Sequence, residues 1–174
     1  MTDSIFMNAQ LEMTAPAAKP KEVGSLKKKI MLVDDDPAIR QILVRLLEEE
    51  EYLVVTAANG VEALATNEAT KVDLVLLDLN MPVKGGWETF DQLTRENPLL
   101  PVILITARPN QLFPALGSGV GALLEKPLDF VKLFDTIHTL LEEDPEERLA
   151  RLAGHSSMFR YAPPIPGSLK SQSK

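Results

Sequence analysis

The sequence contains no cysteine, no excess of positive charge and no long hydrophobic run. The absence of cysteine excludes disulfides, thiolate zinc sites and cysteine nucleophiles. No apolar run approaches the roughly 18 residues of a membrane span, and the first residues lack the basic start and apolar stretch of a secretory signal. A formal net charge of −7 argues against nucleic-acid binding, which requires a basic face. We therefore expect a soluble, acidic, cytoplasmic protein that binds neither nucleic acid nor a membrane.

The 174 residues suffice for one domain with additional segments. Residues 1–26 have no sustained apolar period, and we expect them to form a flexible N-terminal arm. A single domain is expected over residues 27–141. Residues 142–174 are expected to form a C-terminal extension, in which a short helix at 145–152 precedes a disordered tail rich in serine, proline and glycine.

Within the predicted domain, short apolar runs alternate with amphipathic stripes. The runs suit strands buried on both faces and lie at residues 30–33, 52–55, 72–77, 102–105 and 122–124. Between them, apolar residues recur at helical spacing, and Asp36 followed by Pro37 offers an N-cap and a first-turn proline. The prolines and glycines of segment 108–121 allow only a short helix. This alternation predicts an α/β fold, with a doubly wound parallel sheet and helices on both faces.

Polar residues follow directly on four of the predicted strands. They are Asp34, Asp35 and Asp36 after the first run, Asp78 after the third, Thr106 after the fourth and Lys126 after the fifth. Taken singly, each is an ordinary cap, turn or surface residue. Together they are expected at the carboxyl ends of the strands of one parallel sheet. Clustered carboxylates there repel each other unless a cation compensates their charge. Oxygen ligands alone suit Mg²⁺, and a metal, a lysine and a threonine around one aspartate form a pocket for phosphoryl transfer.

The same residues occur in motifs that resemble the receiver domain of bacterial two-component response regulators. The motifs are Val33-Asp34-Asp35-Asp36-Pro37, Leu77-Asp78-Leu79-Asn80-Met81-Pro82, Gly86, Thr106-Ala107 and Lys126-Pro127, in the family's order and near its spacing. The resemblance implies a flavodoxin-like receiver fold with five strands in the order 2-1-3-4-5. It also implies that a histidine kinase or a histidine phosphotransfer protein donates a phosphoryl group to Asp78, the phosphoacceptor.

The resemblance also assigns the ligands of a Mg²⁺ cofactor. Asp35 and Asp78 would bind the ion directly, together with the main-chain carbonyl of Asn80. Asp34 would act mainly through a metal-bound water.

Two further residues would contact the phosphoryl group. By the resemblance, Lys126 pairs with Asp78 and then with the phosphoryl oxygens, and a cis bond to Pro127 aims the ammonium inward. Thr106 would hydrogen-bond a phosphoryl oxygen and so report phosphorylation.

The chain departs from the family at the switch positions. Leu123 stands where the family usually has a tyrosine or phenylalanine that moves with Thr106, and Gly85 stands where it often has an aspartate. The usual aromatic rotation is therefore unavailable. We expect segment 108–121 to respond to phosphorylation instead.

The predicted function is that of a stand-alone response regulator, a phosphoacceptor rather than an enzyme. It would signal to an unidentified downstream protein through phosphorylation-dependent contacts or a phosphorelay. Two alternatives stay open. Leu123 leaves room for a receiver-fold scaffold that works without phosphorylation. Phosphatases of the haloacid dehalogenase type also use an aspartate nucleophile and Mg²⁺, although they place an acid two residues after it, where this chain has Asn80.

Overall fold

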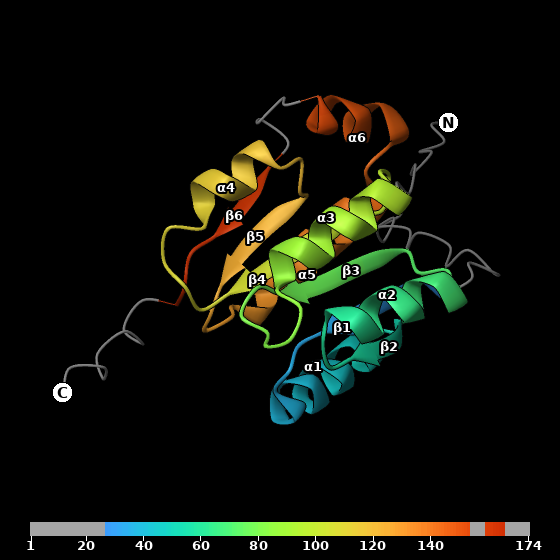
Figure 1. Cartoon of the computed structure of the whole chain (residues 1–174), viewed down its shortest axis with the longest axis vertical. Coiled ribbons are helices and arrows are strands. Elements are labelled where there is room, and N and C mark those ends of the chain that lie inside the picture. Colours follow the sequence, from blue (N-terminus) through green and yellow to red (C-terminus); the bar gives the residue numbers. More distant parts are fainter. Residues whose placement is uncertain (1–26, 154–158, 166–174) are drawn as a thin grey trace, which may run out of the picture.

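A six-stranded parallel sheet forms the centre of the computed structural model, which describes residues 27–153 and 159–165. The strands are β1 (Lys29–Val33), β2 (Leu53–Ala57), β3 (Leu74–Asp78), β4 (Val102–Thr106), β5 (Ala122–Glu125) and β6 (Arg160–Ala162). The helices are α1 (Pro37–Glu49), α2 (Gly60–Ala69), α3 (Gly86–Glu96), α4 (Leu112–Gly117), α5 (Phe130–Glu142) and α6 (Pro145–Leu152). The strand order is β2-β1-β3-β4-β5-β6, and every neighbouring pair is parallel (Figure 1).

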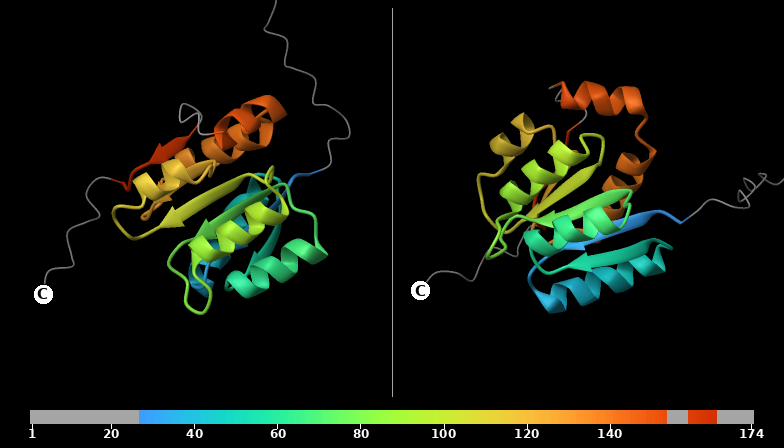
Figure 2. Two further views of the ribbon diagram at one scale, coloured as in Figure 1. Left: turned by 45° about the horizontal axis from the view of Figure 1, so that its top comes forward. Right: turned by 45° about the vertical axis from the view of Figure 1, so that its right-hand side comes forward.

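Helices cover both faces of the sheet (Figure 2). On one face, α2, α3 and α4 contribute Ala63, Phe90 and Ala115 to a core cluster. On the other face, α1 and α5 contribute Leu43 and Ile137 to a second cluster. Successive residues of the central strands enter the two clusters alternately. This burial on both faces explains why those strands are continuously apolar in the sequence.

These elements confirm the fold class predicted from the sequence. Each of the five apolar runs forms a strand, with ends displaced by one or two residues. The side chain of Asp36 caps α1 by accepting the N–H groups of Ala38 (2.8 Å) and Ile39 (3.3 Å). The single short helix expected within segment 108–121 is α4. Over the described ranges, no helix combines the length and the apolar character required to cross a membrane.

The sheet has one strand more than the five predicted. β6 pairs with β5, and Leu123 and Leu124 lie opposite Tyr161 and Ala162. The expectation of disorder therefore does not hold for residues 159–165. The strand carries no apolar run because it is an edge strand in which only Ala162 is buried, so pairing with β5 stabilises it more than its own composition does. The predicted N-terminal arm, 1–26, and the other parts of the predicted tail lie outside the described residues.

Two arginines attach α6, the predicted short helix of the extension, to the domain. Arg151, 5% exposed, donates from Nε (3.0 Å) and Nη2 (2.9 Å) to the two carboxylate oxygens of Glu143, and it also donates to the carbonyl of Gly119. Arg148 donates to the same carboxylate (3.3 Å) and to the carbonyl of Leu99 (2.8 Å). The two guanidinium groups compensate the buried charge of Glu143. The extension is thus bound to the loops that lead into β4 and β5.

Candidate functional site

The carboxyl ends of β1, β3 and β5 bring two aspartates and a lysine together. Asp34 follows β1 and Asp78 ends β3, and the two residues are only 1% and 3% exposed. Lys126, directly after β5, donates from Nζ to Asp34 Oδ2 (2.9 Å) and to Asp78 Oδ2 (2.6 Å). Residues distant in the sequence form one charged cluster because parallel strands end at the same sheet edge.

The second oxygen of each buried carboxylate accepts a backbone N–H. Asp36 N–H donates to Asp34 Oδ1 (2.8 Å), and Asn80 N–H donates to Asp78 Oδ1 (2.9 Å). All four oxygens of the two carboxylates therefore have a partner, which offsets the cost of burying two like charges. The guanidinium of Arg40 also donates to the main-chain carbonyl of Asp34 and holds the loop after β1.

Lys126 is held in its charged form. Burial by itself would lower the pKa of Lys126, but the hydrogen bonds and charges of Asp34 and Asp78 outweigh burial and raise the pKa above its ordinary value. The peptide bond from Lys126 to Pro127 is cis, as the resemblance implies. An ammonium group therefore lies between the two carboxylates at neutral pH.

Asp35 adds a third carboxylate to the cluster. Oxygen atoms of Asp34, Asp35 and Asp78 lie within 4.8 Å of one another, and Asp35 is exposed. Within the described part of the chain, the buried side-chain Oδ1 of Asn80 has no hydrogen-bond partner. Three carboxylates face the single ammonium of Lys126, so a divalent cation fits the remaining negative charge. This set of oxygen donors could bind a metal ion, and it fits the chemistry of Mg²⁺.

Thr106 ends β4 beside the cluster and is fully buried. Its Oγ1 accepts the N–H of Arg108 (3.0 Å), at the start of segment 108–121. Its main-chain carbonyl accepts the N–H of Lys126 (2.7 Å). The threonine thus connects the lysine on one side with the loop before α4 on the other.

Leu123, the second predicted switch residue, lies within β5 and is fully buried. It belongs to the same core cluster as Ala115 of α4. Phe159, which precedes β6, packs against that cluster. An aromatic side chain of the C-terminal extension therefore reaches the cluster that contains the leucine, a contact that no sequence pattern indicated.

Trp87 forms another contact that the sequence did not reveal. Its Nε1 donates to Gln111 Oε1 (3.0 Å), which links the first turn of α3 to the residue before α4. Nothing in the spacing of the two residues in the sequence suggests such a pair. The hydrogen bond places the only tryptophan of the chain beside segment 108–121, where it can serve as a fluorescent reporter.

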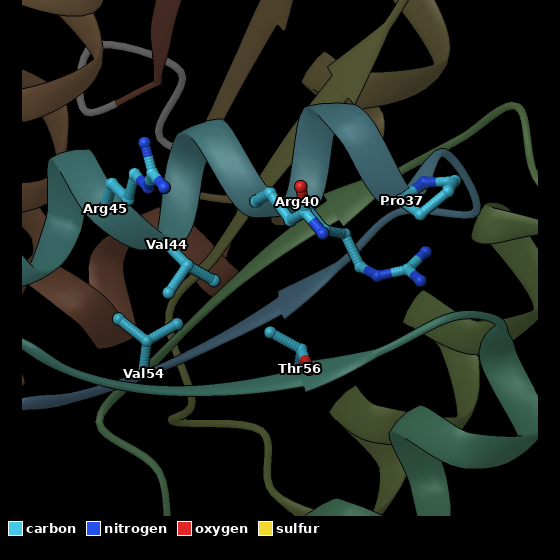
Figure 3. Close-up of a pocket in the computed structure, with 7 residues that line it drawn as sticks. Pro37, Arg40, Val44, Arg45, Val54 and Thr56 are labelled. Carbon is cyan, nitrogen blue, oxygen red and sulfur yellow. The ribbon is translucent and has the colours of Figure 1, made fainter.

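A pocket of about 500 Å³ lies elsewhere, between α1 and β2 (Figure 3). It is lined by Pro37, Arg40, Gln41, Val44, Arg45, Val54 and Thr56. Figure 3 shows the guanidinium of Arg45 pointing away from the strand. None of the predicted site residues lines this pocket, so the acidic cluster at the carboxyl ends of the strands is a separate site.

Gly86 lies so close to the site that a side chain does not fit. A Cβ there would lie 2.5 Å from the carbonyl oxygen of Asp78 and 2.5 Å from the Cα of Leu79. We expect Gly86→Ala to displace this backbone and to lower the free energy of unfolding by about 1–3 kcal/mol. Gly85→Ala is the matched control, because its Cβ would meet nothing within 4 Å. Urea unfolding measures both variants, and equal losses would contradict the explanation.

Comparison with known sequences identifies the family. The family model described as the response regulator receiver domain matches residues 30–138. The chain is 38% identical over 116 residues to the transcriptional regulatory protein GlrR of Escherichia coli, and the aligned part covers 66% of this chain but 26% of GlrR. The chain belongs to the receiver domain family, and it spans about a quarter of the length of that relative.

Solved structures agree with this assignment. The response regulator TrrA of Thermotoga maritima in complex with Mg²⁺ and BeF has a TM-score of 0.61 and 33% identity, covering 65% of this chain and 98% of the other. TrrA in complex with the histidine kinase ThkA has a TM-score of 0.60 and 33% identity, covering 66% and 98%. These likenesses confirm the five-strand part of the fold, whereas the family match ends at residue 138, before α6 and β6.

Proposed function

We propose that this chain is a phosphoacceptor of two-component signalling, and that Asp78 receives a phosphoryl group from the phosphohistidine of a histidine kinase or a phosphotransfer protein. The observation that carries the proposal is Lys126, whose ammonium bridges the buried carboxylates of Asp34 and Asp78. The similar TrrA has been solved with Mg²⁺ and BeF and with a histidine kinase, which supports both the ion and the donor. Such a donor implies that the chain acts in the cytoplasm.

The transfer begins with attack of an Asp78 carboxylate oxygen on phosphorus. A P–O bond to Asp78 forms, the P–N bond to the donor histidine breaks, and the leaving nitrogen keeps the electron pair. Lys126 can follow the developing charge because its Nζ already lies 2.6 Å from Asp78 Oδ2. The hydroxyl of Thr106 can donate its proton in a hydrogen bond to a phosphoryl oxygen.

Mg²⁺ would be held by Asp35, by Asp78 and by the main-chain carbonyl of Asn80, with Asp34 acting through a bound water. When bound, the ion supplies positive charge that neutralises the phosphoryl oxygens. The exposure of Asp35 supports this role, because an exposed ligand leaves the ion accessible to a donor protein.

The acyl phosphate stays on the chain, so the activity is that of a phosphoacceptor and not of an enzyme with a separate substrate. We propose that the chain accepts the phosphoryl group without help from a further domain, as a stand-alone response regulator. Its output would be contact with a downstream protein or onward phosphotransfer. A phosphatase of the haloacid dehalogenase type has less support, because Asn80 cannot supply the acid that such enzymes place two residues after the nucleophile.

Incubation of the purified chain with acetyl phosphate and Mg²⁺ tests the proposal. We expect intact-mass spectrometry to show one added phosphoryl group per chain, and none when EDTA removes the ion. Absence of the adduct under both conditions would contradict the proposal and favour the phosphorylation-independent scaffold. An adduct that forms equally well in EDTA would contradict the metal assignment.

Variants of two adjacent aspartates distinguish metal binding from helix capping. Asp35→Asn removes a carboxylate ligand, and we expect it to weaken Mg²⁺ binding about tenfold or more, equivalent to at least about 1.4 kcal/mol. Asp36→Ala removes the cap of α1, which accepts the N–H groups of Ala38 and Ile39. This variant should lose about 1 kcal/mol of stability and keep its Mg²⁺ affinity. Titration calorimetry distinguishes the two, and equal losses of affinity would show that the ligand is misassigned.

A further inference from the structure

The C-terminal extension contacts both ends of β5, the strand that leads to Lys126. Before β5, the guanidinium of Arg151 in α6 donates to the carbonyl of Gly119. Along β5, β6 forms a parallel ladder, and the N–H of Arg160 donates to the carbonyl of Gly121 (3.2 Å). Figures 1 and 2 show β6 beside β5 at the edge of the sheet. Arg151 and Arg160, which make these contacts, lie beyond residue 138, where the family match ends.

The two parts of the extension are held with unequal strength. α6 is attached through Arg151, which bonds the carbonyl of Gly119 and is fixed by a buried pair with Glu143, the two side chains being 5% and 6% exposed. β6 has three residues, of which Arg160 and Tyr161 are exposed, and its outer edge has no neighbouring strand among the described residues. A short edge strand with an exposed ladder opens more readily than a helix held by a buried ion pair.

The contacts of β6 lie next to the residues of the phosphoryl site. The hydroxyl of Tyr161 donates to Glu125 Oε1 (3.0 Å), and Glu125 directly precedes Lys126. Thr106 pairs with Glu125 in the β4–β5 ladder, and its carbonyl accepts the N–H of Lys126. β5 is therefore bonded to β6 on one side and to β4, which ends in Thr106, on the other.

We propose that β6 is a releasable strand, docked on β5 while Asp78 is unmodified and released when Asp78 is phosphorylated. This inference rests on the proposed function and names its regulation. A phosphoryl group draws the ammonium of Lys126 and the hydroxyl of Thr106 toward new oxygens. Both residues lie at strand ends next to Glu125, so the end of β5 moves away from the position in which Tyr161 bonds it.

The same coupling acts in the opposite direction. If phosphorylation disfavours docking of β6, variants that disfavour docking must favour the phosphorylated state, by at most the factor by which phosphorylation disfavours docking. Tyr161→Phe removes only the hydroxyl bonded to Glu125. Arg160→Pro removes the N–H that donates to Gly121 and disfavours the strand. Tyr52→Phe, which changes the other tyrosine of the chain, is the matched control.

Amide hydrogen exchange of the full chain, with Mg²⁺ alone and with Mg²⁺ plus beryllofluoride as a phosphoryl mimic, tests the release directly. We expect the amides of 160–162 to exchange at least about fivefold faster with the mimic, whereas those of α6 keep their rates. Titration calorimetry confirms that the mimic has bound. Unchanged or slower exchange at 160–162 in a sample that binds the mimic would overturn the proposal and leave the proposed function intact.

Acetyl phosphate labelling of the variants tests the reverse coupling. Tyr161→Phe and Arg160→Pro should raise the steady-state ratio of phosphorylated to unmodified chain by about two- to tenfold, the effect of one lost hydrogen bond, and Tyr52→Phe should leave it unchanged. Circular dichroism verifies that each variant is folded. Equal labelling of all four chains would overturn the proposal, and failure of the wild-type chain to label would overturn the proposed function together with it.

Discussion

Asp78→Asn is expected to abolish phosphoryl uptake from acetyl phosphate, with a loss of about a hundredfold or more in the labelled fraction. An amide oxygen is a poor nucleophile, and the acyl phosphate needs a carboxylate. The fold should persist, because asparagine keeps an oxygen for the N–H of Asn80 and Lys126 keeps its bond to Asp34. Intact-mass spectrometry measures the effect.

Asp73 provides the matched control for that experiment. Asp73 directly precedes the amino end of β3, whereas Asp78 is at the carboxyl end. It is partly buried, and its carboxylate accepts the backbone N–H of Lys29 (2.8 Å). Asp73→Asn therefore changes a carboxylate on the same strand without touching the acidic cluster. We expect it to label like the wild-type chain. Labelling of Asp78→Asn at the level of the control would contradict the assignment of the phosphoacceptor.

Lys126→Met should destabilise the domain strongly. The variant leaves Asp34 and Asp78 buried without the ammonium that bonds both, and removal of one partner from a buried ion pair costs about 3–5 kcal/mol. Because the pKa of Lys126 is raised in the folded protein, the stabilisation is fully present below the ordinary pKa of lysine and is lost only as the pH rises through the higher, folded value. Urea unfolding at neutral pH measures the full effect.

Lys28→Met serves as the control for the lysine. Lys28 pairs with Asp73 at 3.2 Å, but the two side chains are 49% and 36% exposed, so this change should cost less than about 1 kcal/mol. Addition of Mg²⁺ should restore part of the stability of Lys126→Met, since the ion can compensate the negative charge of the same carboxylates. Equal destabilisation by the two substitutions would contradict the central role of Lys126.

The parts of the site that follow strands could be predicted from the sequence. A continuous apolar run indicates a strand buried on both faces, and in a parallel sheet the residues after such runs meet at one edge. This reasoning places four residues of the site close together: Asp34, Asp78, Thr106 and Lys126. The resemblance also indicated the bond between Lys126 and Asp78. The backbone partners could not be predicted, because almost every residue carries an N–H and a carbonyl and the sequence does not indicate which of them bond.

β6 shows where sequence reasoning fails. A three-residue edge strand needs neither alternation nor an apolar run, since its stability comes from the exposed edge of β5. The contacts of Phe159 and Tyr161 are long-range for the same reason: each depends on how the chain returns to the sheet after α6. Phe159 and Tyr161 also lie beyond residue 138, where the family match ends.

The most direct test of the account is the chemical location of the phosphoryl group. Borohydride reduces an aspartyl phosphate to homoserine, and peptide mass spectrometry assigns that change to one residue. After treatment with acetyl phosphate and Mg²⁺, we predict homoserine at position 78 and unmodified aspartate at positions 34, 35 and 36. Reduction at any of those three positions, with Asp78 unmodified, would contradict the account.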